Sequence, residues 1–135
     1  MRCLEDLGLI HEESKEGMVA LNKMIQAIKA HPDYPKIGMI ASHLGVVRGI
    51  SLNGKTVRGI EVRFDENSVE RIASETRKMP GIVTVLVETY AGQLAVGDEI
   101  MAVVVGGDTR SHVFPALMTA VDRLKAEAAT KKELY

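Results

Sequence analysis

The chain has 135 residues, 46% of them hydrophobic and 26% charged, with a formal net charge of −1 at pH 7. This length favours one domain with a single core, and the composition excludes disordered and fibrous classes. The balanced charge argues against a protein that coats nucleic acid or an anionic membrane. A single cysteine, Cys3, excludes an internal disulfide framework.

The N-terminal segment is acidic where a secretory signal would be apolar, and no apolar run approaches the ~20 residues that cross a bilayer. We therefore expect a cytoplasmic protein without membrane contact. Residues 1–16 are charged and weakly patterned, which predicts either a short strand or a mobile arm. A helix follows from Gly17 and ends at Pro32. Its apolar face, at three- and four-residue spacing, holds Met18, Leu21, Ile25 and Ile28.

Residues 36–64 predict a β-hairpin. The segment 36–51 is extended and mostly apolar, and Asn53-Gly54 is typical of a two-residue turn with positive φ at both central positions. The return strand, 56–64, alternates between apolar and polar residues, so one side of the hairpin should face solvent.

A second helix is predicted with Asp65, Asn67 or Ser68 as its cap, and it should end at Pro80-Gly81. The β-branched segments 82–90 and 98–105 predict two strands separated by a turn-rich segment. The stripe of the second helix is Val69, Ile72, Ala73, Thr76 and Met79.

The last helix should start near Ser111 or His112, because Pro115 is tolerated only in the first turn. The order of elements predicts a single α+β domain over residues 1–135, with two layers and helices packed on an antiparallel or mixed sheet. The expected apolar stripe of the last helix is Phe114, Leu117, Met118, Val121, Leu124 and Ala128.

The junction GGDTRSH, residues 106–112, could bind an anion. Its glycines permit a tight turn, the following helix offers unpaired N–H groups, and Arg110 adds a planar cation. These features predict a phosphate or carboxylate site. The alternative is an ordinary loop in which Asp108 or Ser111 caps the helix and Arg110 is solvated.

Lysines near the C-terminus form a second candidate. If the last helix continues, each residue advances ~100°, so Lys132 returns to the stripe of Lys125 about 10 Å along the axis, whereas Lys131 points elsewhere. Two such ammonium groups could clamp an anion or supply a nucleophile or base. The alternative is a solvated helix end, where lysines are favoured by the helix dipole.

Arg48, between glycines in GVVRG, could reach into a cleft or be an ordinary exposed strand residue. The four histidines lack metal-ligand spacing, so we expect no metal and no cofactor. The sequence also lacks a GxSxG elbow, which argues against a conventional hydrolase.

Taken in order, LGVVRG (44–49), GDEIMAVVVGGDTRSHVFPALMTAVDRLK (97–125) and KKE (131–133) resemble the large, catalytic subunit of molybdopterin synthase. The resemblance covers roughly residues 36–133 and leaves the N-terminal arm and helix, 1–35, outside it. It implies an α/β-hammerhead fold and a sulfurtransferase of molybdenum cofactor biosynthesis, which converts cyclic pyranopterin monophosphate into dithiolene-bearing molybdopterin.

The same resemblance implies two kinds of protein partner. One is a small ubiquitin-like sulfur-carrier subunit whose Gly-Gly C-terminus is thiocarboxylated. The other is a second large subunit, which gives a homodimer at the centre of a heterotetramer.

The resemblance assigns Arg110 and Arg48 to the substrate phosphate or pterin. It assigns Lys125 and Lys132 to sulfur transfer, with Lys131 as the rival second lysine if one residue has been deleted.

Thr109 stands where the family motif has histidine, so that residue's role is either missing or moved to His112. The alternative function is therefore a non-catalytic dimeric relative that has lost the reaction and binds a pterin, a nucleotide or a partner's tail.

Overall fold

The computed structural model describes the backbone of residues 12–135 and the side chains from residue 20 onward. Cys3 lies outside this range, as does the predicted arm or strand up to residue 11. The helices are α1 (Glu12–Lys29), α2 (Glu66–Arg77) and α3 (Arg110–Arg123), followed by a π-helical turn at Leu124–Ala128. The strands are β1 (Met39–Val46), β2 (Gly59–Phe64), β3 (Ile82–Thr89), β4 (Gly92–Ala95), β5 (Glu99–Gly107) and β6 (Ala129–Leu134).

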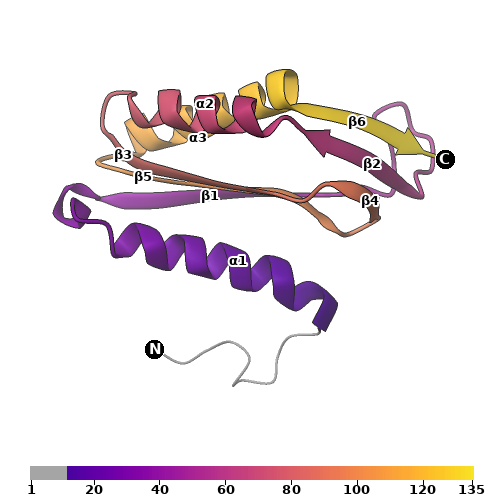
Figure 1. Cartoon of the computed structure of the whole chain (residues 1–135), viewed down its shortest axis with the longest axis horizontal. Helices are drawn as coiled ribbons and strands as arrows, with labels where there is room; N and C mark the ends of the chain where they lie inside the picture. Colours follow the sequence, from indigo (N-terminus) through magenta and orange to yellow (C-terminus); the bar gives the residue numbers. More distant parts are fainter. Residues whose placement is uncertain (1–11) are drawn as a thin grey trace.

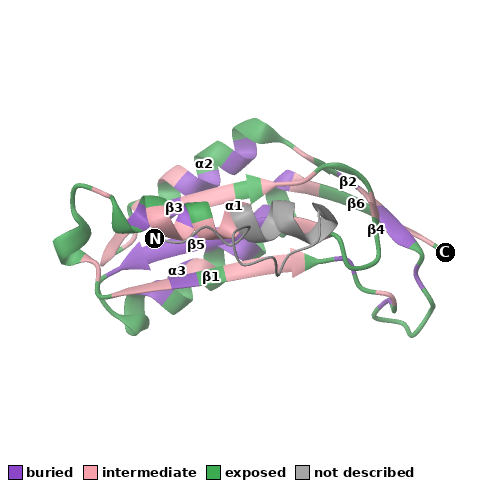
Figure 2. Cartoon of the chain, turned by 90° about the horizontal axis from the view of Figure 1, so that it is seen from below, coloured by how far each residue is buried: buried purple, intermediate pink, exposed green. Residues whose placement is uncertain are grey.

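The strands form two antiparallel sheets, with strand orders β1-β5-β3 and β4-β2-β6. Strand β5 is the buried centre of the first sheet (Figure 2). Its Val103 and Val105 pack toward α2 and α3, whereas Ala102 and Val104 pack toward α1. The α+β class is confirmed. Helices lie on both faces of this sheet (Figure 1), which adds a third layer to the predicted two.

Helix α1 begins at Glu12, five residues before the predicted start at Gly17. The predicted face is confirmed at Leu21, Ile25 and Ile28, which pack against the α1-facing side of β5, whereas the side chain of Met18 lies outside the described residues. Met24, which was not predicted, is buried in the same cluster. Among the helices of residues 12–135, none combines the length and apolar character that crossing a bilayer requires.

Helix α2 confirms its prediction. Ile72 is fully buried, and the Thr76 hydroxyl donates to the Ile72 carbonyl at 2.7 Å, so a polar residue is accommodated in the apolar stripe. The predicted strands after α2 are also present as β3 and β5, which pair with each other. In this part of the chain the spacing of apolar residues in the sequence matches the faces that are buried.

The predicted hairpin across Asn53-Gly54 is wrong. Strand β1 pairs with β5, and β2 pairs with β4 and β6, so the two arms belong to different sheets and share a single bridge, Ile50–Thr56. The predicted turn required positive φ at both Asn53 and Gly54. Only Gly54 has it, with φ of 87°. Each arm instead forms a longer ladder with another strand, β1 with β5 and β2 with β6.

Helix α3 begins at Arg110, one residue before the predicted start, but its expected stripe is partly wrong. Phe114 is 54% exposed and Met118 is 68% exposed. The small residues Ala116 and Ala120 are fully buried instead, and they allow α3 to lie close to β5.

The helix does not continue to Lys132, so the condition under which Lys132 would share the stripe of Lys125 is not met. Regular α-helix ends at Arg123, one π-helical turn follows, and residues 129–134 form β6. Six residues of β6 pair with β2, from Ala129 opposite Phe64 to Leu134 opposite Gly59. This ladder outweighs the helix propensity of the segment.

Candidate functional site

A hollow of about 530 Å³ lies where the two sheets meet. It is lined by β1 and the loop after it, β2, β5, the π turn and β6. We call it the cationic hollow, because Arg48, Lys125 and Lys131 line it. Its walls are largely apolar and include Val62, Phe64, Ile100 and Met101.

Strand register decides which C-terminal lysine lines the hollow. Lys131 pairs with Val62, and residues directly opposite each other across a ladder project to the same face. Lys132 pairs with Glu61 and therefore projects to the other face. Of the two alternatives, Lys131 and not Lys132 lies in one hollow with Lys125.

The π turn positions Lys125. Leu124 is fully buried in the main core, and the Ala128 carbonyl accepts a hydrogen bond from the Asp65 N–H at 2.9 Å, so both ends of the turn are fixed. The extra residue of a π turn changes the direction in which the intervening side chains project. Lys125 is exposed and lines the hollow.

A group of charged side chains braces the outer side of this turn. We call it the charged clamp, and it consists of Arg71, Glu75, Arg123 and Glu127. The Glu127 carboxylate accepts hydrogen bonds from Arg123 Nε at 2.8 Å and from Arg71 Nη2 at 3.1 Å. Arg123 also lies 3.3 Å from the Glu75 carboxylate. The hydrogen bond from Arg123 is the main reason that the pKa of Glu127 is lowered.

Arg48 follows directly on a fixed residue. Val47 is 3% exposed, its N–H donates to the Asp98 carbonyl, and its own carbonyl accepts from the Gly97 N–H, both at 2.9 Å. The loop after β1 is thereby attached to the turn between β4 and β5. Arg48 is exposed and reaches the hollow from this fixed point.

His43 also lines the hollow, although no sequence motif pointed to it. It lies on β1, and its Nε2 atom is buried without a hydrogen-bond partner among the described residues. Burial, and secondly the charge of Lys125, lower the pKa of His43 below its usual range. Period-two alternation along β1 would have indicated its face, but a lone histidine matches no motif.

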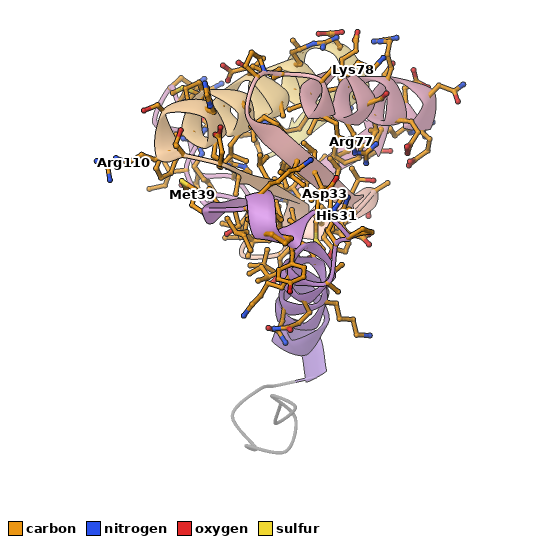
Figure 3. The ribbon with its side chains drawn as sticks, turned by 90° about the vertical axis from the view of Figure 1, so that its left-hand side faces the viewer. His31, Asp33, Met39, Arg77, Lys78 and Arg110 are labelled. Carbon is orange, nitrogen blue, oxygen red and sulfur yellow. The ribbon has the colours of Figure 1, made fainter. Side chains whose placement is uncertain are left out.

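The other predicted residues lie at the opposite end of α3. Thr109, rather than Asp108 or Ser111, is the N-cap residue of this helix. The Asp108 carboxylate accepts hydrogen bonds from His112 Nδ1 at 2.8 Å and from the Thr109 N–H at 2.6 Å. The bond with His112 is the first cause of the lowered pKa of Asp108. Arg110 is exposed and projects outward at the rim of the molecule (Figure 3).

The length of α3 separates these two groups. The helix has 14 residues, which at 1.5 Å per residue puts about 20 Å between Arg110 and Lys125. A single chain therefore brings Arg48, Lys125 and Lys131 together, and it leaves Arg110, Thr109 and His112 apart from them.

A second hollow, the apolar groove, runs along the exposed side of α3 and has a volume of about 480 Å³. Phe114, Pro115, Leu117 and Met118 line it, with Asp122 at its polar edge. Within the described side chains, no three His, Cys, Asp or Glu residues are grouped where they could hold a metal ion.

Comparison with known proteins identifies the family to which this chain belongs. The MoaE protein family matches residues 15–127, and the chain belongs to that family. The match takes in α1, so the likeness extends further toward the N-terminus than the motifs indicated.

Named relatives are proteins of molybdopterin biosynthesis. The molybdopterin synthase catalytic subunit of Ralstonia nicotianae is 31% identical over 118 residues, which cover 84% of this chain and 65% of that protein. The chain thus spans slightly less than two thirds of this curated relative.

Solved structures agree in fold. The molybdopterin cofactor biosynthesis protein E of Burkholderia multivorans superposes with a TM-score of 0.67 at 34% identity, over 84% of this chain and 79% of that one. A complex of subunits 1 and 2 of the molybdopterin-converting factor from Helicobacter pylori has a chain with the same fold, with a TM-score of 0.61 at 16% identity, over 84% and 82% of the two chains.

Proposed function

We propose that this chain is the catalytic subunit of a molybdopterin synthase. It would move sulfur from the thiocarboxylated C-terminus of a small partner subunit to a cyclic pyranopterin monophosphate. The observation that carries this proposal is the cationic hollow, in which Arg48, Lys125 and Lys131 line one apolar-walled cavity of a MoaE-family chain.

The hollow suits both reactants, because each is anionic. A thiocarboxylate and a phosphate are attracted by fixed cations, and apolar walls strengthen that attraction by limiting screening. In each transfer the C–S bond to the acyl carbon of the donor tail breaks and a C–S bond to a pterin carbon forms, and that pterin carbon gives up a C–O bond in exchange. Water supplies the oxygen with which the tail ends as a carboxylate. Lys125 is the proposed contact of the reacting sulfur, and Arg48 and Lys131 hold the charged groups beside it.

The proposal needs a second copy of the chain. Arg110 lies about 20 Å from Lys125 along α3, so Arg110 would serve the hollow of a partner copy, together with Thr109 and His112. The exposed Phe114 and Met118 lie along the same helix, and a homodimer would bury them. A two-fold arrangement would build two equivalent sites.

The proposed sulfur donor is a small ubiquitin-like subunit ending in Gly-Gly. A tail without side chains is slender enough to enter a hollow between two sheets. The Helicobacter pylori structure of the same fold is a complex of subunits 1 and 2 of the molybdopterin-converting factor, which supports a second kind of subunit as the partner of this chain.

The test is to mix the protein with a thiocarboxylated small subunit and the cyclic pterin and to measure dithiolene formation. Transfer of sulfur to the pterin is the expected result. No product, while an authentic synthase works under the same conditions, would contradict the proposal.

A second candidate function is a dimeric relative that binds the pterin or the tail without reaction. Thr109, at the position of the family motif's histidine, favours it, because one proton-transfer group is absent there. Calorimetry separates the two functions. The binding relative would bind the pterin phosphate without turnover, and Lys125→Ala would leave its affinity nearly unchanged.

A further inference from the structure

His43 stands between the two hollows of the molecule. Along β1, Ala41 packs on the α3 side of the sheet and Leu44 on the α1 side. Because side chains alternate along a strand, His43 projects to the α3 side. It lines both the cationic hollow and the apolar groove. Its imidazole therefore separates a charged cavity from an apolar one.

The free ring nitrogen of His43 lies beside a residue that lines the cationic hollow. A Cβ atom at Gly45 would lie 3.3 Å from His43 Nε2, and Gly45 itself lines the cationic hollow. Nε2 is buried and has no hydrogen-bond partner among the described residues. A buried polar atom without a partner costs free energy, so a ligand that supplies the missing partner gains from this site.

The charges around His43 favour an anion as that ligand. Arg48 from the loop after β1, Lys125 from the π turn and Lys131 from β6 line the hollow on the Nε2 side. Asp122 of α3 lies on the other side, in the groove. Without a ligand, burial and Lys125 keep the pKa of His43 low and the ring neutral at pH 7. An anion between the cations and Nε2 would oppose this effect.

We propose that His43 is an anion-binding residue of the cationic hollow, where Nε2–H donates a hydrogen bond to the bound anion and the imidazole takes up one proton from solvent as the anion binds. This inference rests on the proposed function and adds a residue to its site. The anion is the thiocarboxylate of the donor tail or the phosphate of the pterin, since both are anions that accept hydrogen bonds.

Proton uptake fixes the sign of the pH dependence. The pKa of His43 is low in the free protein and higher beside the anion, so affinity for the anion increases as pH falls through the interval between the two values. The gain approaches tenfold for each unit by which the anion raises the pKa of His43.

The first experiment measures sulfate binding at pH 8 and pH 6 by calorimetry, because sulfate keeps its charge over this range. We expect the affinity of the unmodified protein to rise several-fold at the lower pH. His43→Gln keeps a hydrogen-bond donor but cannot titrate, so its affinity should be nearly the same at both pH values. His31→Gln, just after the end of α1 and outside both hollows, is the matched control and should behave like the unmodified protein.

NMR titration of the His43 ring supplies an independent readout, and sulfate should raise the pKa of His43. The inference is overturned if sulfate does not bind, if His43→Gln keeps the full pH dependence, or if the His43 titration is the same with and without sulfate. These measurements need neither small subunit nor turnover, so their failure differs from failure of the sulfur-transfer assay.

Two further arms identify the natural anion. One uses a short peptide ending in a Gly-Gly thiocarboxylate, and the other uses the pyranopterin phosphate. The ligand that raises the pKa of His43 is the one that contacts it. A shift with either ligand supports the inference, and no shift with both overturns it.

Discussion

The two ends of helix α3 both carry cations, but the fold treats them differently. At the C-terminal end, Lys125 lines a hollow that the same chain completes with Arg48 and Lys131. At the N-terminal end, Arg110 projects from the rim beside the exposed Thr109 (Figure 3). One chain thus brings together only part of the proposed site, and under the proposal a second copy supplies the remainder.

The two ends are also fixed in different ways. The C-terminal end is anchored from within by Leu124, which is fully buried, and from outside by the charged clamp. At the N-terminal end the buried core residue is Val113, three residues after Arg110, and the loop before the helix is held by the hydrogen bonds of Asp108 to Thr109 and His112. An internally anchored lysine suits a reacting group, which must be held in place.

The largest effect is expected for Lys125→Ala. Removing the proposed contact of the reacting sulfur should lower the rate of dithiolene formation by roughly 100-fold or more, the range usual for a direct participant in the chemistry. Because Lys125 is exposed, the melting temperature should stay nearly constant. Rates close to those of the unmodified protein would show that the C-terminal end of α3 is not reactive.

The next effect separates two neighbouring lysines of β6. Lys131→Ala should weaken sulfur transfer by about tenfold, the equivalent of one lost charged contact. Lys132→Ala is the matched control, since its side chain is on the other face of the strand, and it should change the rate little. Steady-state assays of both variants decide the matter, and the reverse ranking would mean that the β2–β6 register differs from the one described.

A smaller effect is expected for Glu127→Ala. This change removes the carboxylate that joins Arg71 to Arg123 and should loosen the π turn, so sulfur transfer should fall a few-fold through displacement of Lys125. The melting temperature should fall only slightly, because exposed ion pairs contribute little to stability. Glu70→Ala, an exposed glutamate on α2, is the control. Equal rates for the two variants would show that the charged clamp does not position Lys125.

The smallest effect concerns Asp108. Its pKa is lowered from 3.8, so its contribution to stability is present above that pH and is lost as the pH falls through the lower folded-state value. Below about pH 4, the melting temperature of the unmodified protein should therefore fall slightly more than that of Asp108→Asn. If the melting temperatures of the two proteins fall equally over this pH range, the assigned role of Asp108 is contradicted.

Where local pattern and tertiary packing agree, the sequence predicts the structure. The stripe around Ile72 in α2 and the β-branched runs of β3 and β5 read correctly, because their periods match the faces that they bury. The 129–134 segment is different. It is rich in helix formers, and its strand conformation depends on pairing with β2, a partner some 70 residues away in the chain.

The difference between the periods of a helix and a strand also explains which lysine lines the hollow. On a helix, Lys132 would share a face with Lys125, whereas on strand β6 the residue opposite Val62 is Lys131. Arg48 and Lys125 could be selected from the sequence because family-like motifs surround them. His43 could not, since its importance comes from two cavities that only the folded chain creates.

Exchange of subunits between two variants tests whether Arg110 serves the hollow of a second copy. Arg110→Ala and Lys125→Ala are each prepared as inactive protein, mixed in equal amounts, and allowed to exchange subunits. In mixed dimers one site would combine the intact Lys125 of one chain with the intact Arg110 of the other. Half of the dimers would carry one such site, so activity should recover to about a quarter of the unmodified level. If subunits exchange and the mixture stays inactive, the two ends of α3 do not meet across a dimer, and the account is wrong.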